Sequence, residues 1–350
     1  MSPEISVLMA VCNEKEEFLK QALDSILKQT YTGFEFIIID DGSSNHIQEL
    51  LNRYNDPRII LIRNQTNLGL TKSLNIGLNV AKSKYIARLD SDDIAMPDRL
   101  KRQHEFLTRH RDIAAVGSWY IGINSVGHKI KTGTPVFESH MIRWRLLFKN
   151  TFIHSSIMYK KILAQRIGGY DESFSSSQDY DLWSRLNLNW ETVNIPERLI
   201  KLRIHENSIS SKNKSEQLDN LKKISKRNIE KIFDKKISKT AFVQLSSIYL
   251  KENLNNLFFD ITALDRDFEK LLRIFLKKYC YTNKSIIQDL KADIAYHIFL
   301  AILRSSVITP SRIKSAIKWI ALNSNSLFHS FFYIIFKRTL LYGLINKTND

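Results

Sequence analysis

Short apolar runs alternate with helical patterns through the N-terminal part of this chain. The runs cover residues 5–11, 34–39, 58–62 and 84–89, and each has the length of a strand. Apolar stripes typical of helices lie between them, over residues 18–27, 47–54 and 70–81. Alternation of strand and helix implies parallel strands with right-handed crossovers, and strands this apolar are expected to be buried on both faces. The sequence therefore predicts an α/β fold with a Rossmann-like, mostly parallel sheet.

Polar side chains stand at the carboxyl ends of three predicted strands. Asn13 and Glu14 follow the first strand, Asp40 and Asp41 the second, and Asp90–Asp93 the fourth. An open parallel sheet binds its ligand beyond the carboxyl ends of its strands, so these side chains are expected to meet at one site. Residues that served only their own turns would not need to converge there.

The stretch Asp90–Asp93 has three carboxylates within four positions. Oxygen-rich clusters suit a hard divalent cation, and a cation at a strand end can hold a diphosphate. The alternative is a turn before a helix, because Asp and Ser are common in turns and caps and Pro97 can open a helix. An EF-hand loop is excluded, because Ala95 and Lys101 stand where that loop needs Gly and Glu.

The turn after the first strand excludes two common nucleotide-binding folds. It runs from Cys12 to Glu17 without the glycine-rich pattern of a dinucleotide-binding domain, and its acidic residues would repel a pyrophosphate. The sequence also has no P-loop pattern. We therefore expect the phosphates of a ligand to be held in another way.

Several short motifs follow one another along residues 4–211 of the sequence. They are Ser6–Val11 with Asn13 and Glu14, Ser25–Leu27 with Gln29–Tyr31, Asp40–Ser43, Asn67–Gly69, Ala87–Asp93, Gly168–Asp171, Gln178–Trp183, and Arg203–His205 with Ser208. In this order they resemble the inverting family 2 glycosyltransferases of bacterial surface-polysaccharide synthesis, which have the GT-A fold. Each motif is weak by itself, and their common order carries the resemblance.

The resemblance implies a donor held by a divalent cation. Asp90 and Asp92 would form the DXD motif that holds Mg²⁺ or Mn²⁺ against the donor diphosphate, with Asp92 as the direct ligand. The cation would neutralise the charge that grows on the departing nucleoside diphosphate. His205 would be a further ligand of the metal or the diphosphate, and the alternative is a histidine of the surface or the core.

The resemblance also implies a uridine site. Asp41 would accept a hydrogen bond from N3–H of uracil, which cytosine cannot donate. The backbone around Ala10 would flank the base, and Asp40 would lie beside it or cap the following turn. For Lys72, near the phosphates, a solvated charge is the alternative. The other residues expected at the donor nucleotide are Val11, Asn13, Glu14, Asn67, Asp90 and Ser91.

Inverting transfer requires a base that takes the proton of the acceptor hydroxyl as it attacks. The resemblance gives this role to Asp179, and the preceding Gln178, at the acceptor side, replaces the usual Glu. If the stretch is helical, Asp181 points about 200° away from Asp179 and cannot share the site. Trp183 lies on the same helical face as Asp179 and would stack under the acceptor sugar. The alternative is that Trp183 is a buried aromatic residue of the core.

The charge distribution divides the chain. Lys and Arg exceed Asp and Glu by 27 to 24 over residues 1–210 and by 25 to 12 over residues 211–350. We predict a glycosyltransferase domain over residues 1–211 and a basic, helical region over 212–350, joined by a polar, Lys-rich linker at 211–226. The basic region would associate with an anionic membrane or form an oligomer.

Two segments near the C-terminus carry the membrane prediction. Residues 305–323 include Thr309–Pro310, a cap and first-turn pair, followed by an amphipathic pattern. Residues 327–345 are apolar, but Lys337 and Arg338 lie near the middle, and each central charge costs about 2.5–3.5 kcal/mol on insertion. A helix lying in the membrane interface is therefore favoured over a span, and the alternative is a helical bundle or dimer contact.

The resemblance, together with these patterns, predicts a cytoplasmic glycosyltransferase, peripheral at the inner face of the cell membrane. It would transfer a sugar from a UDP-sugar to a glycan or lipid-linked acceptor. Cys12 and Cys280 form no disulfide or zinc pattern, and the first apolar run follows Glu4 too closely for a signal peptide. Two alternatives are a nucleotidyltransferase acting on sugar phosphates and a non-enzymatic protein that binds nucleic acid or anionic surfaces. Nucleic acid is not the expected partner, because the sequence has no RNA- or DNA-binding motif.

Overall fold

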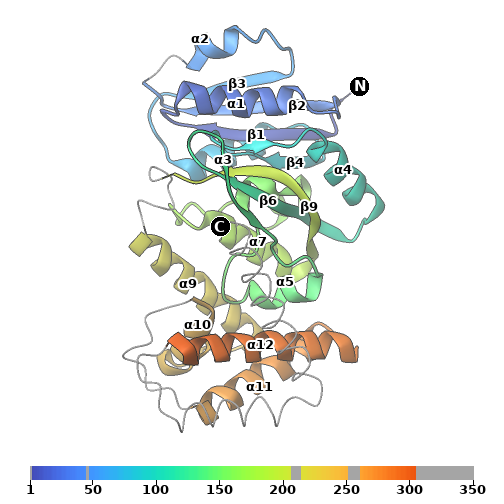
Figure 1. Cartoon of the computed structure of the whole chain (residues 1–350), viewed down its shortest axis with the longest axis vertical. Helices are drawn as coiled ribbons and strands as arrows, with labels where there is room; N and C mark the ends of the chain where they lie inside the picture. Colours follow the sequence, from blue (N-terminus) through green and yellow to red (C-terminus); the bar gives the residue numbers. More distant parts are fainter. Residues whose placement is uncertain (1, 45–46, 206–213, 251–260, 305–350) are drawn as a thin grey trace, which may run out of the picture. The chain divides into compact units, whose positions relative to one another are not determined.

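The computed structural model describes residues 2–44, 47–205, 214–250 and 261–304 (Figure 1). The chain divides into two compact units, Met1–Ile224 and Ser225–Asp350. The linker predicted at 211–226 is wrong from Lys214 onward, where helix α9 (Lys214–Phe233) begins. The segment is polar in composition, but two of its apolar residues, Leu221 and Ile224, pack into a core of the first unit.

The first unit is built around one mixed sheet with strand order β3-β2-β1-β4-β8-β6-β9-β5, and β7 pairs with β6. The strands β1 to β4 are parallel, as predicted, whereas β8 runs antiparallel to both β4 and β6. The described strands are β1 (Ile5–Val11), β2 (Phe34–Asp41), β3 (Ile59–Asn64), β4 (Tyr85–Arg88), β5 (Ile94–Ala95), β6 (Ile113–Ile123), β7 (Lys129–Gly133), β8 (Met158–Lys160) and β9 (Glu191–Arg203).

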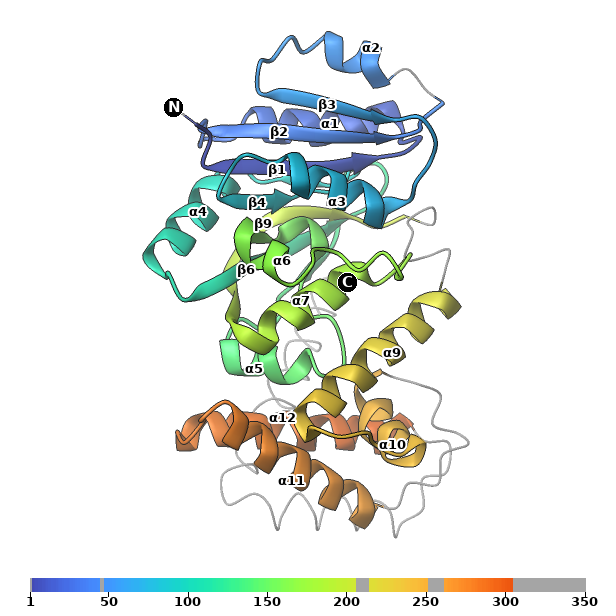
Figure 2. The ribbon, with the colours of Figure 1, turned by 180° about the vertical axis from the view of Figure 1, so that it is seen from behind.

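Helices cover both faces of this sheet. Alternate residues of β1 point to opposite faces, so Val7 and Met9 join one core with α1, while Leu8 and Ala10 join the other with α3. Helix α1 lies in front of the strands in Figure 1, and α3 lies in front of them in Figure 2, which shows the molecule from behind. The helices are α1 (Glu16–Leu27), α2 (Ile47–Asn52), α3 (Leu70–Val80), α4 (Arg99–Arg109), α5 (Ser139–Arg145), α6 (Lys161–Arg166) and α7 (Gln178–Asn189), with a short 3₁₀ turn η1 (His154–Ser156).

The second unit is helical in its described part. It contains α10 (Lys239–Leu250), α11 (Ile261–Lys278) and α12 (Lys284–Arg304), which pack against one another. Tyr249 donates its hydroxyl to Asp293 Oδ2 at 2.9 Å inside this unit, so the burial of that carboxylate is compensated by a hydrogen bond. Over the residues that the structure describes, no helix combines the length and the apolar character needed to cross a membrane. The segments 305–323 and 327–345 lie outside the described residues.

Candidate active site

Loops that follow β1, β2 and β3 lie against one another. Asn13, with a positive φ of 51°, donates its amide N–H to Ser43 Oγ at 3.0 Å and accepts from Ser44 N at 2.9 Å. Gly42 has a φ of 68°, and a Cβ at this position would lie 2.6 Å from the backbone N of Asn67. Only glycine fits so close an approach in this backbone conformation. The ends of β1 and β2 therefore converge as the sequence predicts, and the loop after β3, which the predicted set of convergent strand ends did not include, lies against them.

Asp41 is buried at the end of β2 and organises the loop that leads into α3. Its Oδ1 accepts from Asn64 Nδ2 and from the amide of Leu68, both at 2.8 Å, and its Oδ2 accepts from the amide of Gly69 at 2.9 Å. A carboxylate has about four acceptor positions, so three donors leave room for a fourth. Sequence reasoning missed Asn64, although it too stands at the carboxyl end of a predicted strand.

Asp40 is buried beside Asp41 and has the turn-capping role that the sequence left open. Its Oδ1 accepts from the amide of Ser43 at 3.0 Å, and its Oδ2 lies 3.4 Å from Arg63 Nε. Ala10 and Val11 are buried, whereas Asn67 and Lys72 are exposed. Asn67 donates to the exposed Cys12 Sγ at 3.1 Å, which brings a thiol that the sequence left unassigned to this edge of the sheet.

Asp90, directly after β4, is held by two fixed partners. Its Oδ1 accepts from Arg88 Nη2 at 2.5 Å and its Oδ2 from Ser155 Oγ at 2.7 Å. Burial alone would raise the pKa of Asp90, but the charges of Arg88 and His154 and the hydrogen bond from Ser155 outweigh it and lower the pKa. Asp90 is therefore an ionised group whose two oxygens are already engaged.

Asp92 differs from Asp90 in its partners. Its Oδ2 lies 2.9 Å from His205 Nε2, and Glu14 reaches the same loop by accepting from Ser91 Oγ at 3.1 Å. Burial, followed by repulsion from Asp90 and Glu14, raises the pKa of Asp92, although the hydrogen bond to His205 opposes this. The loop thus has more negative charge than its protein partners neutralise, and a divalent cation with oxygen ligands would relieve that excess.

The oxygen and imidazole ligands at this loop are of the kind that binds a divalent cation, but they do not surround one point in space. In the described parts of the chain no group of three or more His, Cys, Asp or Glu side chains is arranged to hold a metal ion. Asp92 Oδ2 and His205 Nε2 lie 2.9 Å apart, so the hydrogen bond between them would have to be lost for both atoms to bind one ion.

Two buried arginines behind the loop are residues whose role sequence reasoning missed. Arg88 and Arg99 are fully buried, and Arg99 donates to the carbonyl oxygen of Arg88 at 2.6 Å. Burial and the neighbouring charge of Arg88 lower the pKa of Arg99 to about 9. Charged residues inside a predicted strand and a first helical turn are the signal that could have revealed them, because an unpaired charge is costly to bury.

Asp179 lies in the first turn of α7, so the stretch is helical, which is the condition under which the sequence separates Asp181 from Asp179. Its Oδ2 accepts from Asn150 Nδ2 at 2.7 Å, and Asn150 is itself fixed because its Oδ1 accepts from the amide of Phe152 at 3.0 Å. Burial raises the pKa of Asp179 to about 6, with a further rise from the charge of Asp90, against the lowering effect of hydrogen bonds from Asn150 and the backbone. Asp179 is therefore a carboxylate poised near neutral pH.

Three residues of α7 near Asp179, namely Gln178, Asp181 and Trp183, are buried. Asp181 is fully buried and pairs with Arg185 at 2.5 Å, on another side of the helix as predicted. Trp183 is 0% exposed and packs against Phe152 and Tyr159. This contradicts the predicted sugar contact of Trp183, because other side chains cover this face of α7 at Trp183, one turn beyond Asp179. Gln178 is buried as well.

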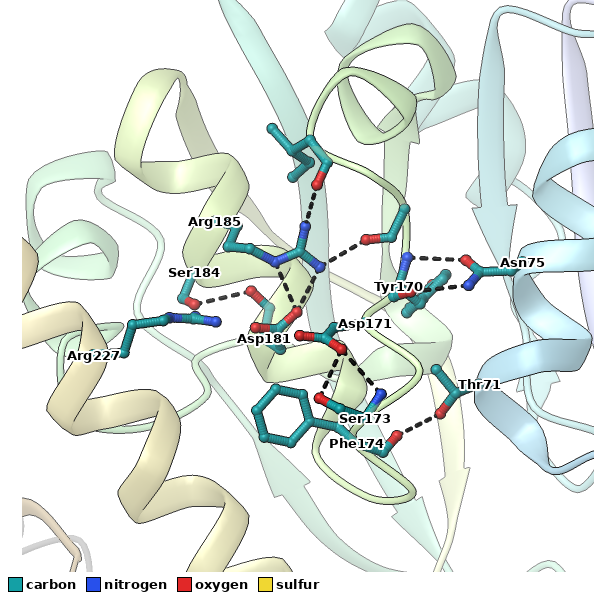
Figure 3. A network of polar contacts seen from close by, with 12 residues as sticks. Thr71, Asn75, Tyr170, Asp171, Ser173, Phe174, Asp181, Ser184, Arg185 and Arg227 are labelled. Carbon is teal, nitrogen blue, oxygen red and sulfur yellow. Dashed lines mark hydrogen bonds and ion pairs between the residues drawn. The ribbon is translucent and has the colours of Figure 1, made fainter.

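The loop between α6 and α7 is clamped on two sides (Figure 3). On one side, Asn75 of α3 donates to the carbonyl oxygen of Tyr170 and accepts from its amide, both at 2.9 Å, and Thr71 donates to the carbonyl oxygen of Phe174 at 2.7 Å. On the other side, Arg185 of α7 donates to the carbonyl oxygens of residues 167 and 169. Helix α3, which begins beside Asp41, is thus tied to the segment that leads to Asp179.

Comparison with known proteins identifies the family. Residues 6–168 match the family model described as glycosyl transferase family 2. The chain is 39% identical over 207 residues to the uncharacterized glycosyltransferase MJ1057 of Methanocaldococcus jannaschii, an alignment that covers 58% of this chain and 71% of the relative. This chain belongs to glycosyltransferase family 2. The family 2 glycosyltransferase is also 36% identical over 213 residues to the O-antigen biosynthesis glycosyltransferase WbnJ of Escherichia coli, covering 58% of this chain and 81% of WbnJ.

Solved structures confirm the GT-A fold of this family 2 glycosyltransferase. The structure of S. aureus TarS 1–349 in complex with UDP-GlcNAc has a TM-score of 0.56 at 16% identity and covers 85% of this chain and 84% of TarS 1–349. The mannosyltransferase PcManGT of Pyrobaculum calidifontis, in complex with GDP-Man and Mn²⁺, has a TM-score of 0.52 at 14% identity and covers 85% and 81%. Family membership selects the glycosyltransferase from the alternatives that the sequence left open.

Proposed function

We propose that this family 2 glycosyltransferase is a hexosyltransferase that moves a sugar from a UDP-sugar to a hydroxyl group of its acceptor, with inversion. The observation that carries the proposal is Asp179, a half-buried carboxylate with a pKa of about 6 that feels the charge of Asp90. A general base works best with a pKa near the operating pH. A base within electrostatic reach of residues 90–93, here called the acidic loop, suits attack on a sugar held by its diphosphate.

Each step of the proposed reaction has residues of this chain assigned to it. Asp41 accepts from N3–H of uracil through its remaining acceptor position, beside the backbone of Ala10. Asp179 takes the proton of the acceptor hydroxyl while that oxygen attacks the anomeric carbon from the side opposite the diphosphate. Asn150 holds the carboxylate of Asp179 in one orientation by donating to Oδ2.

Asp92 and His205 are the side chains that we propose to hold Mn²⁺ or Mg²⁺, with Asp90 and Glu14 nearby. When bound, the cation would stabilise the charge that develops on the departing nucleoside diphosphate. Asp90 contributes negative charge, and Arg88 and Ser155 keep its carboxylate in place. The presence of Mn²⁺ in the PcManGT structure supports the proposed metal dependence.

A screen of nucleotide sugars tests the donor assignment. Purified enzyme is incubated with Mn²⁺ and UDP-, GDP-, CDP- or TDP-linked sugars without acceptor, and release of the nucleoside diphosphate is measured. We expect hydrolysis of a UDP-sugar, because the free acceptor position of Asp41 matches a base that donates from N3. Hydrolysis confined to a GDP- or CDP-sugar would contradict the uridine site. Glycan synthesis is the proposed setting, since WbnJ is named for O-antigen biosynthesis.

The transfer rate should depend on pH through Asp179. Because the base must be ionised and its pKa is about 6, the rate at saturating substrates is expected to fall about tenfold for each pH unit below that value. The measurement is single-turnover transfer between pH 4.5 and 8. A rate that stays constant down to pH 4.5 would exclude Asp179 as the base.

Asn150 offers a matched test of the same assignment. Its amide stabilises the ionised form of Asp179, so Asn150→Ala should raise the pKa of Asp179 and move the acidic limb of the rate profile to higher pH. Asn187→Ala is the control, because Asn187 lies at the far end of the same helix and donates to Thr192. An unchanged acidic limb in Asn150→Ala would contradict the proposed role of Asp179.

We also propose that the enzyme is cytoplasmic and binds the inner face of the cell membrane, where it meets a lipid-linked oligosaccharide. Helix α11 buries Leu264, Phe268, Leu271, Leu272 and Phe275 on one face and exposes a basic stripe on the opposite face. The stripe consists of Arg266, Lys270, Arg273 and Lys277, which recur at helical spacing. Each basic residue near an anionic bilayer contributes about 1 kcal/mol of binding.

Liposome cosedimentation tests this membrane association. Wild-type enzyme should bind vesicles that contain phosphatidylglycerol more strongly than neutral ones, and binding should weaken at high salt. The double variant Arg273→Glu with Lys277→Glu should bind these vesicles more weakly. The control is Lys284→Glu with Lys291→Glu, which changes the net charge by the same amount at exposed positions of α12 and should reduce binding less. Equal binding to both kinds of vesicle would favour the alternative that the C-terminal helices form a homo-oligomer, which sedimentation velocity would reveal.

A further inference from the structure

Arg203, the last residue of β9, brings together parts of the chain that are far apart in sequence. Its side chain is 3% exposed. Nε donates to the carbonyl oxygen of Asp92 at 2.9 Å, Nη1 donates to the carbonyl oxygens of Asn124 and Ser125 at 3.1 Å, and Nη2 donates to Gln21 Oε1 at 2.6 Å. One guanidinium thus connects α1, the acidic loop and the turn between β6 and β7.

The backbone of Arg203 and the flat face of its guanidinium reinforce these connections. Its amide N–H donates to Asp93 Oδ1 at 2.7 Å, so both residues after Ser91 in the acidic loop are bonded to Arg203. The guanidinium lies over the ring of Phe18, 4.2 Å from its centroid, and the ring of Phe18 lies 5.8 Å from that of His205. Phe18 therefore contacts both Arg203 and His205, the histidine two residues later in the chain.

The chemistry of these contacts requires arginine. A guanidinium is a planar fork with five N–H donors, and four hydrogen bonds plus a ring contact use both its edges and its face. Lysine has a single nitrogen and could satisfy only part of this set. The single ammonium group of lysine cannot reach acceptors on several sides at once, so the carbonyl oxygens of Asp92 and of the turn at 124–125 would not all have fixed partners.

We propose that Arg203 is a positioning residue that fixes the acidic loop relative to His205, so that Asp92 and His205 present their ligand atoms to one cation. This inference rests on the metal and UDP site proposed above. Arg203 holds the backbone of Asp92, and the short segment from Arg203 to His205 carries the second ligand atom, 2.9 Å from the carboxylate of Asp92. Residues that orient metal ligands affect metal affinity or activity by about 10- to 100-fold when they are replaced.

Calorimetry of UDP binding, with and without Mn²⁺, tests the role of Arg203. Arg203→Lys should weaken UDP binding about 10- to 100-fold in the presence of Mn²⁺ and leave binding of UDP alone unchanged. Gln21→Met, which removes one acceptor of the guanidinium, should weaken Mn²⁺-dependent binding by a smaller factor. In donor hydrolysis, KM for the UDP-sugar should rise at fixed Mn²⁺ and recover as Mn²⁺ is increased.

Arg102→Lys is the matched control, because Arg102 also makes a forked contact, through Nε and Nη2 to Glu197, but on the exposed side of α4. It should bind UDP and Mn²⁺ as the wild-type enzyme does. Thermal unfolding is measured for all variants, and Gln21→Met carries the test if Arg203→Lys does not fold. A purely structural role predicts a lower melting temperature with unchanged Mn²⁺-dependent binding, and that result would overturn the inference.

The wild-type measurement separates this inference from the function on which it rests. If UDP binding by the wild-type enzyme does not respond to Mn²⁺, the proposed metal site is wrong and the inference falls with it. If the wild-type enzyme responds and both variants respond equally well, the metal site stands and the role of Arg203 is wrong.

Discussion

Asp179→Asn is expected to lower sugar transfer by about 10²- to 10⁴-fold while leaving the affinity for the UDP-sugar near that of the wild-type enzyme. Asn keeps the size of the side chain and can still contact Asn150, but it cannot take a proton at neutral pH. Donor affinity by titration and single-turnover transfer at saturating substrates are the measurements. The large effect on rate and small effect on binding would identify Asp179 as a base.

The neighbouring carboxylate supplies the control. Asp181 is fully buried and bonded to Arg185, so Asp181→Asn should lower the free energy of unfolding by about 1.5–3 kcal/mol, the usual contribution of a hydrogen bond to a charged group. Protein that remains folded should transfer sugar at a rate close to that of the wild-type enzyme. If Asp181→Asn loses transfer and Asp179→Asn does not, the base lies two residues from its proposed position.

Removal of the metal, or of its proposed ligand, should be the other large effect. EDTA should abolish transfer, and Asp92→Asn should weaken Mn²⁺-dependent UDP binding by more than about 100-fold, because a neutral amide is a poor ligand for a hard cation. Titration of UDP with and without Mn²⁺ is the direct measurement. Thermal unfolding should be little changed, since among the described residues His205 is the one hydrogen-bond partner of the Asp92 side chain, and repulsion from Asp90 and Glu14 is relieved.

Asp98→Asn is a suitable comparison for the metal experiment. Asp98 is an exposed carboxylate before α4 that accepts from Thr30 Oγ1 at 2.8 Å, away from the acidic loop. It should bind UDP and Mn²⁺ like the wild-type enzyme. Full transfer activity in EDTA, or unchanged Mn²⁺-dependent binding by Asp92→Asn, would rule out the proposed metal site.

The first half of the sheet could be predicted from sequence because its strands are apolar and separated by amphipathic helices. The runs at 5–11 and 34–39 and the stripe at 70–81 appear in the structure with small shifts of their ends. The convergence of Asn13 with the turn after Asp41 follows from the rule that ligands bind beyond the ends of parallel strands. Local pattern and global topology agree in this region.

The second half could not be predicted in the same way. Strands β5 (Ile94–Ala95) and β8 (Met158–Lys160) are too short to show a period of two, and their pairing partners are distant in sequence. The sequence left two alternatives open for Trp183, a sugar contact and a buried aromatic, because a helical face identifies neighbours along the helix but not what covers them; the structure has the buried aromatic. The proposed role of Arg203 rests on hydrogen bonds with residues 78 to 182 positions away, which no local pattern reveals.

The attachment of α3 at its start and at its middle has a consequence for the choice of nucleotide. The amide of Gly69, just before α3, bonds to Asp41, and Asn75 further along it holds Tyr170 on the approach to Asp179. In the proposed mechanism, base recognition by Asp41 and proton abstraction by Asp179 are thus linked through one helix, so the spacing between them would be set before any substrate arrives. A purine, longer by one ring than uracil, would push its sugar out of line with Asp179. Such a donor would be discriminated against in the rate of transfer even when its binding is tolerated.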